Sequence, residues 1–461
     1  MTSPTCLLIR HAQILLPNGE FLFGDVQTHE RKIVQVAPHI SATPSTETTL
    51  TREIDADGLI LLPGVIDPQV HFREPGLEHK EDLFTASCAC AKGGVTSFLE
   101  MPNTRPLTTT QLALDDKLKR AADKCLVNYG FFIGATGDNL SDLLQATPTP
   151  GIKIFMGSMH GPLLVDQATA LESIFASGDR LIAVHAEDQA RIRQRRQEFA
   201  GRTDPAVHSQ IQDNQAALLA TELALQLSKK YQRRLHILHM STAEEADLLR
   251  RDKPSWVTAE VTPQHLLLNV DAYAKIGTLA QMNPPLRSPH DNAVLWQALL
   301  DGIIDFIATD HAPHTLEEKS QEYPNTPSGM PGVETSLPLM LTQASQGRCT
   351  IAQASHWMST AVAQGYNIPY KGAIAPGYDA DLVLVDLNTY RLVRREELLT
   401  KCGWSPFEGW NLTGWPVMTI VGGQVVYDRG KLDTRVRGQA LTFGEAFSVA
   451  LGVPRTKDVG R

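Results

Sequence analysis

Residues 61–76, LLPGVIDPQVHFREPG, change abruptly from apolar to polar. The first half has the composition of a strand buried on both faces, and the second half contains Asp67, Gln69, His71 and Arg73. Side chains two apart in a strand share one face, so these four would line one surface. Polar groups beside a core are costly without partners. The segment therefore indicates a site for chemistry, although a strand ending in a solvated loop also fits this pattern alone.

Histidines and a carboxylate end other apolar runs along the chain. His185 and His239 each come near the end of such a run, and Asp310 directly follows another. One histidine at a strand end is usually structural. Several at one rim, joined by a carboxylate, are typical zinc ligands. The pattern predicts a metal site.

Lys153 lies among apolar neighbours in GIKIFMG, residues 151–157. A charged ammonium is disfavoured there, so the amine should shift toward its neutral form. A neutral amine reacts with carbon dioxide, and the resulting carbamate could bridge two cations. The alternative is a lysine paired with a carboxylate such as Glu187 or Asp310.

Eight apolar runs alternate with helix-like stretches in the middle of the chain. The runs are 64–71, 95–101, 128–134, 151–157, 181–187, 235–241, 256–262 and 303–309, and the helical stretches include 80–91, 110–124, 166–176, 214–230 and 242–251. Eight strands separated by helices predict an α/β fold, a closed (β/α)8 TIM-like barrel. A doubly wound open sheet competes, but no glycine-rich phosphate loop follows the first strand.

Both chain ends read as short alternating strands. Each end alone has too few strands to cover its edges, so we expect one discontinuous β-sandwich domain from residues 1–62 and 372–461, beside a barrel of residues 63–371.

Composition limits the function classes. The 461 residues include 42% apolar and 20% charged residues, with a net charge of -9. This is typical of a globular protein that acts on small molecules, without the basic footprint of nucleic-acid or membrane binding. The six cysteines are scattered, and the N-terminus lacks a secretory pattern. We expect a cytoplasmic protein without a disulfide framework.

Together, several motifs resemble the dihydroorotases, cyclic amidohydrolases of the amidohydrolase superfamily. They are IDPQVHFREPG, MPNT (101–104), GIKIFMGS (151–158), VHAED (184–188), LHMST (238–242), MNPPLR (282–287) and ATDHAPH (308–314). The resemblance extends through PSGMPGVETSLPLM (327–340) to CGWSPFEGW (402–410). Each motif alone would be a weak signal.

This resemblance implies a ligand set and a reaction. His71, carboxylated Lys153 and Asp310 would hold one zinc ion, and His185, His239 and the same lysine would hold another. The implied reaction is the reversible hydrolysis of the ring amide of dihydroorotate to N-carbamoyl-L-aspartate in pyrimidine biosynthesis. Asp310 would be the catalytic residue, taking a proton from metal-activated water and returning it to the leaving nitrogen.

The substrate carboxylate requires a cationic clamp. Arg73 is the best candidate, because a planar guanidinium can bind a carboxylate through two hydrogen bonds. Arg73 could instead pair with Glu74 or Asp82. The resemblance completes the predicted substrate-binding residues with Asn103, Asn283 and His314.

The chain departs from the family pattern at Gln69, where most relatives have histidine. An amide is a weaker zinc ligand, so the site of His71 and Asp310 should bind metal less tightly. Gln264 is a second departure, expected near Asn283 and His265. The number of bound zinc ions, one or two, stays open.

The long loop 315–333 could cover a bound substrate or be a disordered excursion. Two other functions stay open: a catalytically silent partner of aspartate carbamoyltransferase, and an amidohydrolase for hydantoin or allantoin. Dimers are frequent in the family, so a homodimer and an association with aspartate carbamoyltransferase are the expected assemblies.

Overall fold

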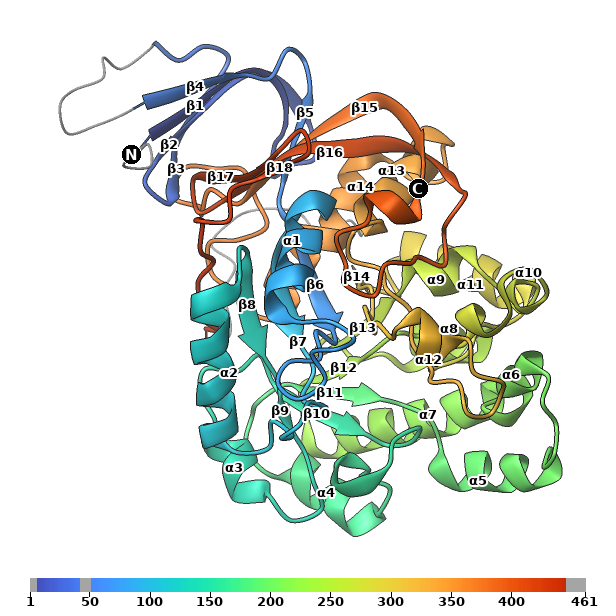
Figure 1. The fold of residues 1–461 in the computed structure, drawn as a ribbon. Coiled ribbons are helices and arrows are strands. Elements are labelled where there is room, and N and C mark those ends of the chain that lie inside the picture. Colours follow the sequence, from blue (N-terminus) through green and yellow to red (C-terminus); the bar gives the residue numbers. More distant parts are fainter. Residues whose placement is uncertain (1–5, 42–50, 445–461) are drawn as a thin grey trace.

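Strands from the middle of the chain form a closed parallel barrel (Figure 1). The computed structural model describes residues 6–41 and 51–444. The barrel strands are β6 (Val65–Val70), β7 (Val95–Glu100), β8 (Asn128–Phe131) continued by β9 (Ile133–Gly134), β10 (Ile152–Phe155), β11 (Ile182–His185), β12 (Leu235–Ile237), β13 (Val257–Val261) and β14 (Phe306–Ile307). Every pair that the sheets connect is parallel. The eight predicted runs contain these strands, and the barrel prediction is confirmed.

The barrel closes beside the polar cluster that ends β6. Strands β6 to β8 form one sheet and β9 to β14 another, and the chain itself joins them between β8 and β9. On the other side, Val70 forms a parallel bridge with His311. The N–H of His71 donates to the carbonyl of His311 over 2.7 Å. The closing contact therefore lies at the predicted site.

Helices surround the barrel and connect its strands (Figure 1). They are α1 (Leu83–Gly93), α2 (Gln111–Lys124), α3 (Leu140–Gln145), α4 (Ala168–Ala176), α5 (Gln189–Glu198), α6 (His208–Ile211), α7 (Asn214–Tyr231), α8 (Ala243–Asp252), α9 (Pro263–Leu267), α10 (Ala272–Ile276), α11 (Pro289–Leu300), α12 (Leu316–Lys319), α13 (Ser336–Ser345), α14 (Ile351–Ser355) and α15 (Ala361–Gly365). Capping boxes set the start of several of these helices. For example, Thr242 and Glu245 satisfy each other's backbone N–H groups at the start of α8.

The two chain ends form one sheet. Its strands are β1 (Cys6–Leu15), β2 (Phe21–His29), β3 (Lys32–Ala37), β4 (Thr51–Asp55), β5 (Ile60–Pro63), β15 (Leu382–Leu392), β16 (Asn411–Val421), β17 (Gln424–Asp428) and β18 (Lys431–Leu432). Strand β5 pairs with β1 and with β15, which joins the N-terminal and C-terminal strands. The small β domain from both ends is present, but its nine strands are linked in a single hydrogen-bonded sheet rather than two separate ones.

Part of the C-terminal segment also contacts the barrel. Trp404 is fully buried, and its indole N–H donates to the carbonyl of His314 over 2.8 Å. Ala440 forms a bridge with Tyr129 of β8. The domain boundaries at residues 62 and 372 stay a prediction.

All six cysteines are buried and free. Among the residues that the structure describes, no helix has the length and apolar character needed to cross a membrane.

A buried ion pair supports the end of β6. Lys117 of α2 lies 2.6 Å from Glu100 at the end of β7, and both side chains are almost fully buried. The other carboxylate oxygen of Glu100 accepts from the backbone N–H of Phe72, 3.0 Å away. The pair therefore anchors the backbone between His71 and Arg73.

We predict that Lys117→Met lowers the free energy of unfolding by about 3–5 kcal/mol, because Glu100 would stay buried without its cation. Chemical denaturation measures this change. The matched control is Lys119→Met, which alters an exposed lysine of the same helix and should change stability by less than about 0.5 kcal/mol. Equal effects of the two substitutions would contradict the prediction.

Candidate active site

The five predicted metal ligands meet at the carboxyl-terminal rim of the barrel. His185 is the last residue of β11, and Lys153 lies in β10. His71 directly follows β6, whereas His239 and Asp310 lie in the turns shortly after β12 and β14. All five are buried. Two pairs are in contact: His71 with Asp310 and His185 with His239. Lys153 interacts electrostatically with one member of each pair, Asp310 and His239.

Three residues of the rim adopt a left-handed backbone. The φ angles are +70° at Arg73, +36° at His239 and +45° at Asp310. Residues with side chains disfavour this region, and such strain is characteristic of functional sites. Each of the three lies in the turn that follows a barrel strand.

His185 is oriented by a carboxylate. Its Nε2 lies 2.8 Å from Oε2 of Glu187, so Nε2 carries the proton that Glu187 accepts. Its Nδ1 therefore presents a lone pair, 2.9 Å from Nε2 of His239. Two imidazole nitrogens facing each other in this way need a shared proton or a shared cation. A carboxylate behind a histidine is also the usual arrangement for metal-bound histidines.

Burial lowers the pKa of His239 well below its usual value, and the nearby His185 and Lys153 contribute to the shift. His239 is thus neutral, which is the form that binds metals.

The second pair is His71 and Asp310. Nδ1 of His71 lies 2.6 Å from the amide oxygen of Asn103, and Nε2 lies 3.1 Å from Oδ1 of Asp310. Burial lowers the pKa of His71, although Asp310 opposes the shift. A neutral His71 that donates Nδ1–H to Asn103 points a lone pair at a carboxylate oxygen. A cation between these atoms would turn a repulsive contact into two favourable ones.

Gln69 contacts the same carboxylate as a donor. Its amide nitrogen lies 3.1 Å from Oδ1 of Asp310, and its amide oxygen is buried with no hydrogen-bond partner in the described part of the chain. Gln69 thus takes the place of a ligand while its N–H group holds Asp310. The expected weakening of this half of the site fits that orientation.

Lys153 is fully buried, and its amine makes no hydrogen bond within residues 6–41 and 51–444. Burial lowers its pKa to about 7, while Asp310 and Glu260 act in the opposite direction. The predicted shift toward a neutral amine is confirmed. The alternative of a lysine paired with Glu187 or Asp310 does not hold, since no ion pair forms with either.

These residues fit a metal only when Lys153 takes part. In the described residues, no three His, Cys, Asp or Glu side chains form a group that could hold a metal ion. Each half of the rim has two such side chains, His71 with Asp310 and His185 with His239. The amine of Lys153 interacts electrostatically with a member of each pair and has no hydrogen-bond partner in the described residues. It is the available third donor, and carboxylation would make it an oxygen donor.

Arg73 and His314 lie together near this rim. The Nε–H of Arg73 donates to the carbonyl of Pro313 over 3.0 Å, and its Nη2 lies 3.3 Å from Nε2 of His314. Arg73 is buried, and burial lowers its pKa to about 10. Neither alternative ion pair forms, because Glu74 pairs with Lys124 and Asp82 pairs with Lys401.

A model of the amidohydrolase family matches residues 60–426. The chain belongs to the amidohydrolase family. A dihydroorotase of Methanosarcina acetivorans is 35% identical, with 94% of this chain and 92% of that protein covered. A dihydroorotase of Halobacterium salinarum is 38% identical, with 80% and 86% covered. Among solved structures, the L-hydantoinase (dihydropyrimidinase) of Arthrobacter aurescens superposes with a TM-score of 0.89 at 29% identity, with 96% of this chain and 100% of that chain covered.

The structure of this amidohydrolase adds contacts that the sequence reasoning did not predict. Glu187 orients His185 and also accepts from Ser158 over 2.5 Å. His208 lies 2.8 Å from the amide oxygen of Asn283. Glu187 follows His185 within the VHAED motif and could have been found there. His208 lies between α5 and α7, where nothing in its local sequence indicates a distant partner.

The other sequence-selected residues lie around the rim. The amide of Gln264 donates to the carbonyl of Thr309 over 3.0 Å, and His265 Nε2 lies 3.0 Å from the carbonyl of Pro284. Both are buried beside the ligands. Loop 315–333 contains α12, and the buried amine of Lys319 donates to the carbonyls of Gln281 and Pro327. The loop is packed, not a disordered excursion.

We predict that Lys153→Met raises the free energy of unfolding by about 1–3 kcal/mol in protein freed of metal and bicarbonate, because a buried polar group without a partner is removed. Chemical denaturation of both proteins measures this. The comparison is Lys117→Met, the same substitution at a buried lysine that has a partner, which should shift stability in the opposite direction. A destabilised Lys153→Met protein would contradict this account of the amine.

Proposed function

We propose that the protein is a zinc-dependent dihydroorotase, which hydrolyses the ring amide of (S)-dihydroorotate to N-carbamoyl-L-aspartate and catalyses the reverse reaction in pyrimidine biosynthesis. The observation that carries this proposal is the rim itself, where two pairs of ligand side chains flank a buried amine next to an arginine and a histidine. Relatives at 34–38% identity over most of the chain are dihydroorotases, which supports this substrate within the family.

We assign the metal to the two halves of the rim. His185, His239 and carboxylated Lys153 would hold the tighter zinc ion. His71, Asp310 and the same modified lysine would hold a second, weakened by Gln69. Bound zinc lowers the pKa of water toward 7 and polarises a carbonyl oxygen, which supplies a nucleophile at neutral pH.

Asp310 is the proposed proton carrier. One of its oxygens, Oδ1, accepts a hydrogen bond from the amide of Gln69. Asp310 accepts the proton of the attacking water and returns it to the ring nitrogen as the amide bond breaks. The amide N–H of Gln69 holds the carboxylate in place for both transfers.

The substrate carboxylate would bind to Arg73 and His314. Asn103 and Asn283 complete the proposed pocket, because each uses its amide oxygen to accept from a histidine. Within the part of the chain that the structure describes, neither amide nitrogen has a protein partner. Both nitrogens can therefore donate to carbonyl or carboxylate oxygens of the substrate.

A second candidate is the hydrolysis of hydantoin or allantoin. It is favoured by the close superposition on L-hydantoinase. The third is a catalytically silent partner of aspartate carbamoyltransferase, which Gln69 motivates. The retained ligands weigh against this third reading, because a silent protein has no need for a buried, unpartnered amine.

The proposal also covers the cellular location and the assembly of the protein. We propose a cytoplasmic enzyme, since six free, buried cysteines are typical of a reducing compartment. A homodimer and an association with aspartate carbamoyltransferase are the proposed assemblies. Size-exclusion chromatography with light scattering, with and without that enzyme, tests both.

We predict that the zinc-loaded protein consumes dihydroorotate and that Asp310→Asn lowers kcat by about 10²- to 10⁴-fold, because the proton carrier is lost. Absorbance of the substrate ring measures turnover. Asp301→Asn, at an exposed position that ends α11, serves as the control and should keep wild-type activity. Turnover of hydantoin or allantoin alone would favour the second candidate, and no turnover by metal-replete protein would favour the third.

We predict that Gln69→His raises the zinc content per chain, because an imidazole replaces an amide beside His71 and Asp310. Metal analysis after exhaustive dialysis measures the stoichiometry. Gln264→His is the matched control, since this buried glutamine contacts Thr309 rather than a ligand and should leave the zinc content unchanged. Unchanged stoichiometry in Gln69→His would count against the assignment of that position.

A further inference from the structure

Four groups surround the imidazole of His314, and they favour opposite tautomers of the ring. Lys80 Nζ lies 3.0 Å from Nδ1, and Glu318 Oε2 lies 3.6 Å from the same nitrogen. The carbonyl of Ser328 lies 3.0 Å from Nε2, and Arg73 Nη2 lies 3.3 Å from it. Each ring nitrogen thus faces one donor and one acceptor.

The two shorter contacts agree on one tautomer. The amine of Lys80 donates, so Nδ1 must present a lone pair. The carbonyl of Ser328 accepts, so Nε2 must carry the proton. The two longer contacts, to Glu318 and Arg73, would suit the opposite tautomer. Burial lowers the pKa of His314 to about 3, with Arg73 and Lys80 adding to the shift, so the ring is neutral and one tautomer must be chosen.

We propose that Lys80 is a positioning residue for the substrate carboxylate, because it holds His314 in the tautomer that carries its proton on Nε2. This inference rests on the proposed function, in which Arg73 and His314 bind a carboxylate. Lys80 lies in the loop between β6 and α1, and its amine forms an ion pair with Glu318 of α12 over 3.0 Å.

The tautomer of His314 decides whether Arg73 and His314 can bind an anion. With the proton on Nε2, His314 donates to the carbonyl of Ser328, and Nη2 of Arg73 keeps its N–H group for a carboxylate. Without Lys80, Nδ1–H would turn to Glu318, and the lone pair of Nε2 would accept from Arg73. That lone pair would repel a carboxylate and occupy one of the donors of Arg73. Loss of Lys80 should therefore weaken substrate binding more than the chemical step.

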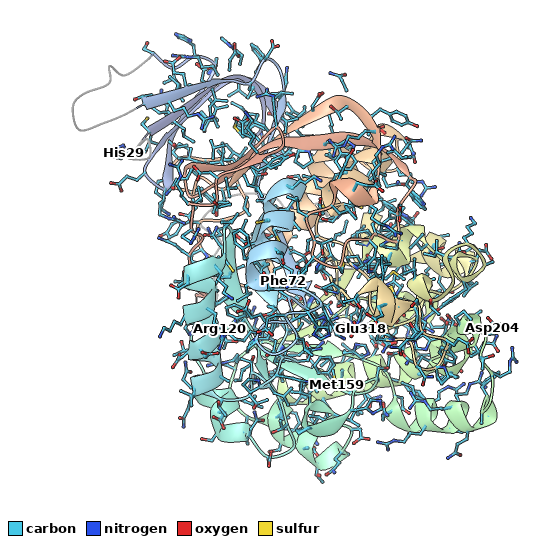
Figure 2. The ribbon with its side chains drawn as sticks, viewed as in Figure 1. His29, Phe72, Arg120, Met159, Asp204 and Glu318 are labelled. Atoms are coloured by element: carbon cyan, nitrogen blue, oxygen red, sulfur yellow. The ribbon has the colours of Figure 1, made fainter. Side chains whose placement is uncertain are left out.

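Lys80 could instead serve only to link two parts of the structure, and a control variant distinguishes this role. Lys80 and Glu318 link the loop after β6 to α12, and His79 makes a similar link, with Nε2 3.2 Å from Oε1 of Glu318. Glu318 and Phe72, the residue between His71 and Arg73, both lie in the central part of the view in Figure 2. His79 has no contact with His314 among the described residues, so His79→Ala removes a link to Glu318 without touching the imidazole.

The first test is kinetic, with zinc-loaded full-length protein and dihydroorotate. Lys80→Met should raise KM by about 10- to 100-fold, the effect of losing a charge-assisted hydrogen bond, and change kcat by less than about 3-fold. Lys80→Arg should recover much of the loss, because its guanidinium can also donate to Nδ1. His79→Ala should leave KM unchanged. Equal KM values for Lys80→Met and His79→Ala would overturn the proposal.

A second set of variants tests whether Lys80 acts through His314. In the His314→Asn background, adding Lys80→Met should change KM by less than about 2-fold, because no imidazole remains to be oriented. An undiminished effect of Lys80→Met in that background would overturn the proposal.

The tautomer can also be read without turnover. Nitrogen NMR of the wild-type protein labelled with 15N-histidine, with His314→Asn used for assignment, should show Nδ1 unprotonated and Nε2 protonated at His314. A proton on Nδ1 in the wild-type protein would overturn the proposal even if Lys80→Met fails to fold. If the wild-type protein shows this tautomer but does not consume dihydroorotate, the proposed function fails and the assignment of the tautomer stands.

Discussion

The buried amine of Lys153 is the constraint on which the site depends. The amine lies 4.3 Å from the ring centroid of Phe155 but has no hydrogen-bond or ion-pair partner among the described residues. Its burial therefore costs free energy, which the packing of the surrounding fold must offset. Destabilising features of this kind are typical of functional sites, where the chemistry requires them. The proposed ligands form two incomplete pairs, so this amine, once carboxylated, would be the donor that makes each pair sufficient for a metal. Its environment, rather than any single histidine, distinguishes this rim from an ordinary polar loop cluster.

The rim is held from outside by contacts between distant parts of the chain. Glu81 accepts from the backbone N–H of Lys401 over 3.1 Å, and Trp404 donates to the carbonyl of His314. The closing bridge between Val70 and His311 lies in the same region. The C-terminal segment therefore does more than complete the β domain, because it fixes the loop that carries Asp310 and His314. The left-handed backbone at three rim residues is stable only because of such surrounding contacts.

Much of the barrel could be predicted from sequence, because strands buried on both faces give continuous apolar runs and the intervening helices show clear amphipathic stretches. The histidines and Asp310 of the rim were found because they stand at or near the ends of such runs, and Lys153 was found because its neighbours within a run are apolar. The single nine-stranded sheet could not be predicted, since the pairing of β5 with both β1 and β15 leaves no signal in the local sequence. Glu187, His208 and Lys80 were likewise missed as partners, because their contacts depend on loop conformations and on which ring nitrogen faces them. The orientation of the Gln69 amide, with its N–H toward Asp310, also required coordinates.

The most direct test of the account is a crystal structure of the protein grown with zinc and bicarbonate, with anomalous data collected at the zinc edge. The account predicts a zinc peak bonded to Nδ1 of His185 and Nε2 of His239, and added carboxylate density on the amine of Lys153. A zinc ion bound elsewhere, or an unmodified Lys153 paired with a carboxylate, would contradict it.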